Sequence, residues 1–433
     1  MKKYDEYKDS GVAWIGEVPK HWEILRGKYV LKILSGFPFD SQKFEFEDNG
    51  VYMPLIRIRD INGSSTEVYY SGSYPIESVV KTGEVLIGMD GDFNISKWKG
   101  TNALLNQRVC KLREDSSMNT HYAFYMLSSP LKAINSVTYA TTVKHLSVYD
   151  IYNAFIPVPP ISEQAAISTY LDTHCAKIDN LISIQQKRIA LLQELKQSVI
   201  TYAVTKGLNP NVEMKQSGVE WIGDVPKHWE VCKLKHYSQV FGRIGFRGYN
   251  QTDLVNEGEG AITLSPSNMQ NGILNYDKCS YLSWKKYYES PEIMIYNDDV
   301  LFVKTGSTYG KISYVADLPM EATINPQIVV FKNIKGNNKY LYYLLSNDIV
   351  QMQVSLTVGG STIPTLSQES ILNYIVPLAP KVEQAAIASY LDHKCATIDV
   401  SISNAQHQID LLQEYKQSLI TEVVTGKRKV TDN

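Results

Sequence analysis

The string SGVAWIGEVPKHWE at residues 10–23 returns as SGVEWIGDVPKHWE at residues 217–230, with only two of fourteen positions changed. A second pair follows, EQAAISTYLDTHCAKID from Glu163 and EQAAIASYLDHKCATID from Glu383. The first pair is offset by 207 residues and the second by 220, so the second copy carries an insert that is 13 residues longer. Near-identical frames around different inserts predict a duplicated scaffold that carries two diversified domains.

The two inserts, residues 24–157 and 231–377, look much less alike than the frames. One correspondence survives inside them, because EVLIGMDG at residues 84–91 resembles DVLFVKTG at residues 299–306. We therefore expect the inserts to share a fold although their sequences have diverged.

A second correspondence lies near the end of each insert. TVKHLS at residues 142–147 lines up with TIPTLS at residues 362–367, at the same offset of 220 as the second frame string. Both strings continue into an apolar, strand-like run that ends in proline. The later register therefore already holds before the inserts end.

Length and composition set outer limits on the fold. At 433 residues, with 44% hydrophobic and 20% charged residues, the chain is expected to form more than one folded domain. The N-terminal residues lack the apolar core of a signal peptide, and no stretch is apolar for long enough to cross a membrane. The five cysteines form no CxxC pair, which favours reduced thiols over disulfides or zinc and predicts a cytoplasmic protein.

Net charge does not identify a partner. Lysine and arginine total 43 against 45 aspartate and glutamate, for a formal net charge of −2. Because proteins that bind nucleic acid usually carry a basic excess, any DNA contact here requires positive charge concentrated on one face or supplied by partners.

Each insert is expected to be β-rich, because short β-branched and aromatic runs alternate with Gly, Asn and Asp turns. Long helix-forming sequence follows each insert. The predicted fold class is α+β with internal duplication. Its segments are a first β-rich domain with its frame at 1–157, a helical spacer at 158–209, a second β-rich domain with the repeated frame at 210–377, and a second helical spacer at 378–433.

The helical segments carry an apolar stripe with steps of three and four residues. Its positions are Ile178, Ile182, Ile189, Leu192, Leu195 and Val199 in the first copy and Ile398, Ile402, Ile409, Leu412, Tyr415 and Leu419 in the second. Each stripe needs a partner, so we predict an antiparallel intramolecular coiled coil. One helix over 177–204 would span about 42 Å. A turn of duplex DNA is roughly 34–36 Å, so the helix pair suits a ruler between two DNA readers.

No catalytic motif is present, since the sequence lacks GxxxxGK[ST], HExxH and GxSxG. Two weaker patterns favour structural explanations. NPQI at residues 325–328 lacks the second proline of an amino-methyltransferase motif. Asp298, Asp299 and Lys304 have the order of a nuclease site, but the two aspartates more simply form a turn before a strand. We expect neither a catalytic nor a metal site.

The repeated strings resemble the specificity (S) subunits of type I restriction–modification enzymes. GVxWIGxVPxHWE, EQxAIxxYLD and the helix LLQExKQSxITxxVT at residues 191–205 and 411–425 are similar to that family's conserved regions. SGFPFDS, GMDGDF and LLNQRV in the first insert are similar to one recurring subclass of the family's recognition domains. The resemblance covers essentially the whole chain.

The resemblance implies a non-catalytic subunit of a multisubunit DNA methyltransferase and endonuclease. In that family each target-recognition domain reads one half of a bipartite double-stranded DNA site. The subunit docks two methyltransferase (M) subunits, which use S-adenosylmethionine. A restriction/translocase (R) subunit that uses ATP and Mg can join them, and the chain itself is expected to bind no cofactor.

Two kinds of loop residue are candidates for DNA contact. Arginine, aspartate, asparagine and glutamine match base-edge patterns, and glycine-, hydroxyl- and lysine-rich segments suit phosphate. The first insert offers Arg57, Arg59, Asp60, Asp90, Asp92, Asn94, Trp98, Asn106, Gln107, Arg108 and Lys144. The second offers Arg243, Phe246, Arg247, Tyr249, Lys304, Ser307, Thr308, Tyr309 and Lys311. His145 becomes Thr365 in the other copy and is a weaker candidate, for a phosphate contact.

Identical polar residues on the repeated helices are candidates for docking methyltransferase subunits. They are Glu194, Lys196 and Gln197 in the first copy and Glu414, Lys416 and Gln417 in the second. Identity on a polar helix face suggests two identical partners, although sequence that has not yet drifted explains it as well.

Two other classes of function stay open. A duplicated protein-binding scaffold or assembly factor would share the frames without reading bases. An enzyme with an unrecognised site would need catalytic motifs that the sequence lacks.

Overall fold

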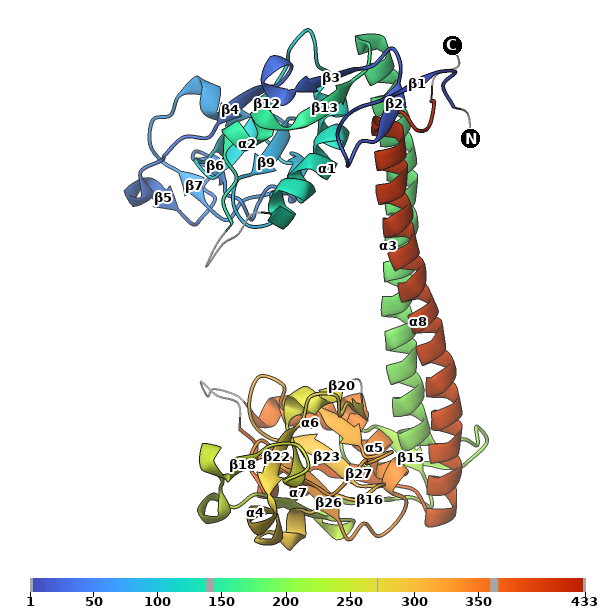
Figure 1. Ribbon diagram of the computed structural model, residues 1–433. Helices are drawn as coiled ribbons and strands as arrows, with labels where there is room; N and C mark the ends of the chain where they lie inside the picture. The colour runs from blue at the N-terminus through green and yellow to red at the C-terminus, as the bar shows by residue number, and fades with distance from the viewer. Residues whose placement is uncertain (1–2, 138–143, 271, 359–364, 431–433) are drawn as a thin grey trace. The chain divides into compact units, whose positions relative to one another are not determined.

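The computed structural model describes residues 3–137, 144–270, 272–358 and 365–430, so the first residues of TVKHLS and TIPTLS lie outside the described residues. The chain divides into two compact units. Unit 1 comprises residues 1–185 and 407–433, and unit 2 comprises residues 186–406. Each unit therefore contains one frame, one insert and a part of each long helix (Figure 1).

The two long helices are α3 (Ile161–Lys206, 46 residues) and α8 (Lys381–Val424, 44 residues). Both begin well before the segment that the apolar stripe marked. Proline explains the early start, because a strand ends in proline before each helix and Pro160 O accepts the amides of Glu163 and Gln164 in the first turn.

The helices pair in both units through the same contact. In unit 1, Lys416 Nζ lies 2.6 Å from Asp179 Oδ1, and in unit 2, Lys196 Nζ lies 2.7 Å from Asp399 Oδ2. The offset of 220 residues converts one ion pair into the other with the helices exchanged. The helices run antiparallel within each unit (Figure 1), which confirms the predicted coiled coil.

The predicted stripe is wrong at one matched pair of positions. Leu195 and Tyr415 are each 50% exposed, whereas Ile398 and Leu419 are buried. Leu195 is one residue away from Lys196, which reaches across to the other helix. A step of three from Leu192 therefore leads out of the helix interface, and the two side chains face solvent.

The frame of unit 1 is two small antiparallel pairs: β1 (Tyr7–Asp9) with β2 (Glu17–Pro19), and β3 (Glu23–Arg26) with β13 (Phe155–Val158). Trp22 is fully buried between them and α3, and its Nε1 donates to Glu163 Oε2 at 3.1 Å. His21 Nε2 lies 2.9 Å from the same oxygen. This joint between frame and helix explains why Pro-Lys-His-Trp and the glutamate recur together.

Unit 2 repeats this frame, with β14 (Met214–Gln216) on β15 (Asp224–Pro226) and β16 (Glu230–Lys233) on β27 (Ile375–Leu378). Trp229 Nε1 donates to Glu383 Oε2 at 3.0 Å.

A glycine closes each helix against its frame. Gly426 has φ +71°, and a Cβ there would lie 2.2 Å from Pro19 Cδ, so only glycine fits. Tyr7 OH donates to Gly426 O at 3.1 Å, which ties the N-terminal strand to the end of α8. Gly207, with φ +76°, occupies the corresponding place beside Trp229 in unit 2.

Insert 1 forms two sheets. One has the order β10 (Ile95–Lys97), β9 (Val85–Gly88), β12 (Val109–Arg113), β4 (Lys32–Ser35). The other has the order β5 (Phe44–Glu45), β7 (Tyr69–Tyr70), β6 (Met53–Ile56), β11 (Ala103–Leu105), β8 (Val79–Val80). Helices α1 (Thr120–Val137) and α2 (Val148–Asn153) follow the sheets along the chain.

Insert 2 repeats the first sheet strand for strand, as β24 (Ile312–Tyr314), β23 (Val300–Val303), β26 (Ile328–Lys332), β17 (Gln239–Gly242). Its second sheet has the order β18 (Leu254–Val255), β22 (Ser280–Ser283), β19 (Gly260–Leu264), β25 (Ala322–Ile324), and a hairpin joins β20 (Met269–Gln270) to β21 (Ile273–Leu274). Its helices are α4 (Trp284–Tyr288), α5 (Asn338–Ser346), α6 (Asp348–Thr357) and α7 (Gln368–Leu372). The shared strand order bears out a common fold for the diverged inserts.

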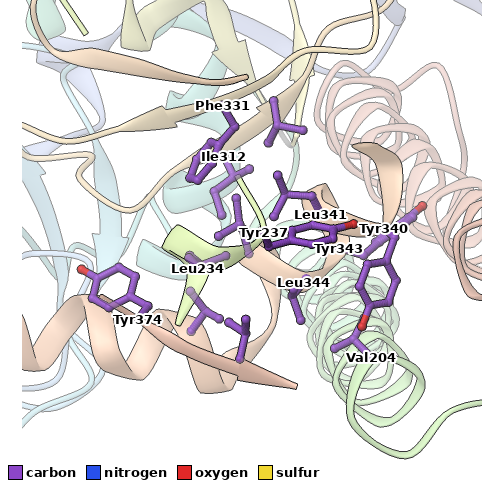
Figure 2. Packing of buried hydrophobic residues seen from close by; sticks show 14 of the residues in the cluster. Val204, Leu234, Tyr237, Ile312, Phe331, Tyr340, Leu341, Tyr343, Leu344 and Tyr374 are labelled. Atoms are coloured by element: carbon purple, nitrogen blue, oxygen red, sulfur yellow. The ribbon is translucent and has the colours of Figure 1, made fainter. Parts of the chain in front are cut away.

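A single core joins each insert to the helices of its own unit. In unit 2, Tyr340, Tyr343 and Leu344 of α5 lie between the sheet residue Phe331 and Val204 of α3 (Figure 2). All five cysteines are free, as expected. Within the described ranges, none of the helices has the length and hydropathy needed to span a bilayer.

A charged cluster fastens insert 1 to α3. Asp172 Oδ1 lies 2.7 Å from Lys97 Nζ and accepts a hydrogen bond of 2.7 Å from Tyr125 OH. His121 Nδ1 lies 3.5 Å from the second carboxylate oxygen. Burial raises the pKa of Asp172, but the hydrogen bonds from Lys97 and Tyr125 outweigh burial and hold that pKa below its ordinary value.

We expect Asp172→Asn to destabilise unit 1 at pH 7 by less than about 1 kcal/mol, because water screens a carboxylate that is 42% exposed. A carboxyl group with a depressed folded-state pKa stabilises above its ordinary pKa near about 4, and this stability is lost as the pH falls. Denaturant unfolding at pH 7, 5 and 3.5 should show the deficit shrinking below pH 4. The exposed Glu47→Gln serves as the control, and a deficit independent of pH would contradict this account.

Candidate DNA interface

The RIRD loop of insert 1 is closed largely by its own charges. Asp60 is buried and accepts the Arg57 amide at 2.9 Å, while Arg57 Nη2 donates to Glu67 Oε2 at 3.0 Å. Arg59 is 66% exposed and lies 3.6 Å from the same glutamate. Arg57 and Asp60 therefore shape the loop, and Arg59 is the side chain that is available at its surface.

Asp90, Arg108 and His145 come together from three separate segments. Asp90 Oδ1 lies 2.7 Å from His145 Nδ1, and Asp90 Oδ2 lies 3.6 Å from Arg108 Nε. Asn106 Oδ1 accepts the Gln107 amide at 2.7 Å and shapes the turn that presents Gln107 and Arg108 to solvent. The sequence placed Asp90 and Arg108 among the candidates, but it did not indicate that they meet.

The turn between β9 and β10 presents Asp92 and Asn94 to solvent, while Phe93 between them is buried with φ 52°. Trp98 lies in the core, 2% exposed, with its Nε1 donating to Thr101 O at 2.7 Å. An aromatic ring held in this way is not available to stack on a base, so we leave Trp98 out of the interface.

Lys144 is tied to helix α1, because its Nζ lies 2.6 Å from Asn135 O and 3.0 Å from Asn135 Oδ1. This bond holds the segment that carries His145 close to the turn at Gly91, whose carbonyl accepts from Asn135 Nδ2 at 2.5 Å.

The first loop of insert 2 is built around a buried cation. Arg243 is 5% exposed and donates to Ile324 O, Thr323 Oγ1 and Arg247 O. Its guanidinium lies 5.2 Å from the ring centre of Tyr249. Burial lowers the pKa of Arg243 from its ordinary value.

Since Arg243 is fully engaged, it supports the loop and we leave it out of the interface. Arg247 Nη1 forms an ion pair with Glu292 at 3.2 Å and stays partly exposed. Phe246 belongs to η5 (Gly245–Arg247), and its side chain lies outside what the structure describes.

KTGSTYGK forms the turn between β23 and β24. Gly306 and Gly310 adopt positive φ angles of 101° and 80°, which favour glycine. Ser307 and Thr308 at the tip are exposed, whereas the exposed area of Tyr309, Lys311 and Lys304 is intermediate. The tip thus presents hydroxyl groups, with two lysines flanking it.

The nuclease alternative finds no support. Asp299 accepts the Tyr296 amide at 2.8 Å and forms an ion pair with Lys332, and Asp298 accepts from Tyr314 OH. Lys304 follows Asp299 by five residues of extended strand, about 16 Å. Among the described residues no three His, Cys, Asp or Glu side chains gather as a metal-binding group.

Most of the candidate docking residues have partners inside their own unit. Lys196 and Lys416 form the ion pairs between α3 and α8, so both lysines have a structural reason to be identical. Gln197 Nε2 donates to Ser346 O, and Gln417 Oε1 accepts from Lys132 Nζ, each at 2.7 Å.

Glu194 and Glu414 remain exposed, each beside exposed apolar side chains. Leu191 and Leu195 neighbour Glu194 in unit 2, and Leu411 and Tyr415 neighbour Glu414 in unit 1. We call these two matched patches, Leu191–Leu195 and Leu411–Tyr415, the helix patches. Sequence reasoning missed them because it assigned Leu195 and Tyr415 to the helix interface.

Comparisons with known proteins agree with the duplicated frame. The family described as the type I restriction modification DNA specificity domain matches residues 19–193 and 226–409. The chain is 27% identical over 417 residues to the type I restriction enzyme EcoBI specificity subunit of Escherichia coli, which covers 94% of this chain and 86% of that protein. It is 25% identical over 420 residues to the MjaVIII specificity subunit of Methanocaldococcus jannaschii, covering 95% and 94% of the two chains.

A solved structure gives the same fold. It belongs to a description of complex assembly and conformational transition of the type I R-M system, with a TM-score of 0.68 at 16% identity over 94% of this chain and 98% of that one. Since the family covers most of the chain, the resemblance in the repeated strings is confirmed. The chain belongs to the family of type I restriction modification DNA specificity domains and carries two copies of that domain.

Proposed function

We propose that the chain is the non-catalytic DNA-sequence-recognition subunit of a type I restriction–modification complex. Each insert reads one half of a bipartite double-stranded site, and α3 and α8 set the spacing between the halves. The naming of relatives as specificity subunits over nearly their whole length supports this function.

The observation that carries the proposal is the duplication itself. Two inserts share one strand order on near-identical frames, yet the loops at their sheet edges differ in charge and chemistry. A molecule that needs two different sequences read at a fixed spacing requires this combination, because phosphate contacts position a protein while base contacts specify the sequence.

The exposed polar side chains of the loops supply the DNA contacts. Arg59, Asp92, Asn94, Gln107 and Arg108 are available in insert 1. Ser307, Thr308, Lys304, Lys311 and Tyr309 are available to insert 2, with Arg247 partly so. The ammonium and hydroxyl groups of the KTGSTYGK turn suit phosphate oxygens, and Arg108 suits a base edge.

Two methyltransferase subunits dock on the helix patches, with Glu194 and Glu414 as polar neighbours and Lys196, Gln197, Lys416 and Gln417 at the flanks. Exposed apolar side chains at matched positions in two copies fit two identical partners. S-adenosylmethionine belongs to these partners, and ATP and Mg belong to a restriction/translocase subunit when one joins. The complex acts in the cytoplasm, where the DNA is.

The test is the methylome of cells that express the chain together with its methyltransferase partner, read by single-molecule sequencing. We expect a bipartite adenine-methylation motif, two short half-sites around an unspecified gap, that disappears when the chain is deleted. A stable complex that methylates no defined motif would instead indicate a protein-binding scaffold.

A further inference from the structure

Insert 1 brings three loop segments together at one edge of its first sheet. The Met89 amide donates to Arg108 O at 3.0 Å, and the Leu146 amide donates to Met89 O at 2.7 Å. These bonds join the residue after β9, the residue before β12 and the segment before α2. Asp90 and His145 form an antiparallel bridge beside them.

Insert 2 has the same backbone arrangement. The Lys304 amide donates to Gln327 O at 2.8 Å, and the Leu366 amide donates to Lys304 O at 2.8 Å. Thr305 and Thr365 form the corresponding antiparallel bridge. The hydrogen bonds therefore define four matched positions independently of any sequence alignment.

The side chains at these four positions differ completely between the copies. The pairs are Met89 with Lys304, Asp90 with Thr305, Arg108 with Gln327, and His145 with Thr365. The frames, by contrast, keep their tryptophan and glutamate in both copies. A constant backbone that carries different donors and acceptors is what two readers of different sequences require.

The side chains of insert 1 at these positions form an ordered cluster. The Asp90 carboxylate contacts both His145 and Arg108, whose side chains are 56% and 57% exposed. A carboxylate that orients two exposed donors leaves the outer nitrogens of the guanidinium for a ligand. Unconstrained drift at exposed positions does not assemble such a cluster.

The side chains of insert 2 offer different chemistry. Gln327 is exposed, and its Oε1 accepts from Asn325 Nδ2 at 3.1 Å, which orients the amide. Lys304 is half-buried, and burial lowers its pKa. Within the described residues its ammonium makes no hydrogen bond or ion pair. An acceptor on a ligand would offset this unpaid desolvation.

We propose that the side chains at these four matched positions select the bases of the two half-sites. This inference rests on the proposed function and specifies which residues carry it. The guanidinium of Arg108 matches O6 and N7 of guanine, and the amide of Gln327 matches N6 and N7 of adenine. The half-site of insert 1 therefore contains a guanine read by Arg108, and that of insert 2 an adenine read by Gln327, with Lys304 donating beside it.

The experiment exchanges the matched residues in the full chain, co-expressed with its methyltransferase partner. R108Q alters only insert 1, and Q327R alters only insert 2. R113Q is the control, because Arg113 is an exposed arginine at the opposite end of the same strand, β12. The methylation motif of each variant is read by single-molecule sequencing.

We expect R108Q to reduce discrimination at one base of one half-site on the order of 10- to 100-fold, leaving the other half-site and the gap unchanged. Q327R should do the same to the other half-site, and R113Q should leave the motif intact. If R108Q abolishes methylation, binding of the purified complex to duplexes that vary at each base gives the same readout.

An unchanged motif, or retained base preference in binding, in both R108Q and Q327R overturns the inference while the proposed function stands. A shift of the same size in R113Q overturns it as well. A wild-type complex without a bipartite motif removes the proposed function, and the inference with it.

Discussion

Replacing Trp22 by alanine is expected to lower the free energy of unfolding of unit 1 by about 3–5 kcal/mol. The side chain is fully buried where the frame, α3 and the end of α8 meet, and Leu171, Ile178 and Val424 belong to the same cluster. Its loss leaves a cavity and also leaves Glu163 without the indole donor. The burial cost of a carboxylate whose side chain is 9% exposed is then only partly offset.

Hydrogen exchange read peptide by peptide measures this effect in the full chain. Trp22→Ala should remove protection in residues 3–137 and leave 210–358 protected. The reciprocal variant Trp229→Ala should do the opposite, because Trp229 is buried in unit 2. Trp221→Ala is the control, since that ring is 43% exposed. Equal loss of protection in Trp22→Ala and Trp221→Ala would contradict the role of the frame joint.

The frame and the helices could be predicted because each obeys a local rule that duplication repeats. The indole donor and its glutamate acceptor occur at the same spacing from the helix start in both copies, so they stand out against the diverged inserts. The helix pair follows from steps of three and four residues. The outward position of Leu195 could not be predicted from these steps, because crossing contacts such as the Lys196–Asp399 pair fix which neighbouring residue faces the other helix.

The candidate DNA contacts were predictable as a group and not one by one. Polar residues in a loop bind a ligand or close the loop itself, and sequence does not distinguish the two. Arg57 and Arg243 have the same chemistry as Arg108, yet one closes its loop on Asp60 and Glu67 and the other is buried. Gln327 gave no signal as part of NPQI, and only the strand order of insert 2 places it opposite Arg108.

Placing glutamate at Leu195 or Tyr415 is expected to remove one methyltransferase subunit each, and the double variant to remove both. A carboxylate in the centre of an apolar contact should cost at least about 2 kcal/mol per site, roughly 30-fold in affinity. Both side chains are 50% exposed, so the folded chain should tolerate the change. Native mass spectrometry of the co-expressed complex should count two, one, one and no partners across wild type, the two single variants and the double variant.

Val400→Glu is the matched control for this series. Val400 is a 60% exposed apolar residue on α8, comparable to Leu195 and Tyr415, but its counterpart 220 residues earlier is Asn180. A surface that serves two identical partners must be apolar in both copies, so Val400 should lie outside it and its variant should retain two methyltransferase subunits. Loss of a partner in Val400→Glu, or two partners retained in the double variant, would place the docking surface elsewhere on the chain.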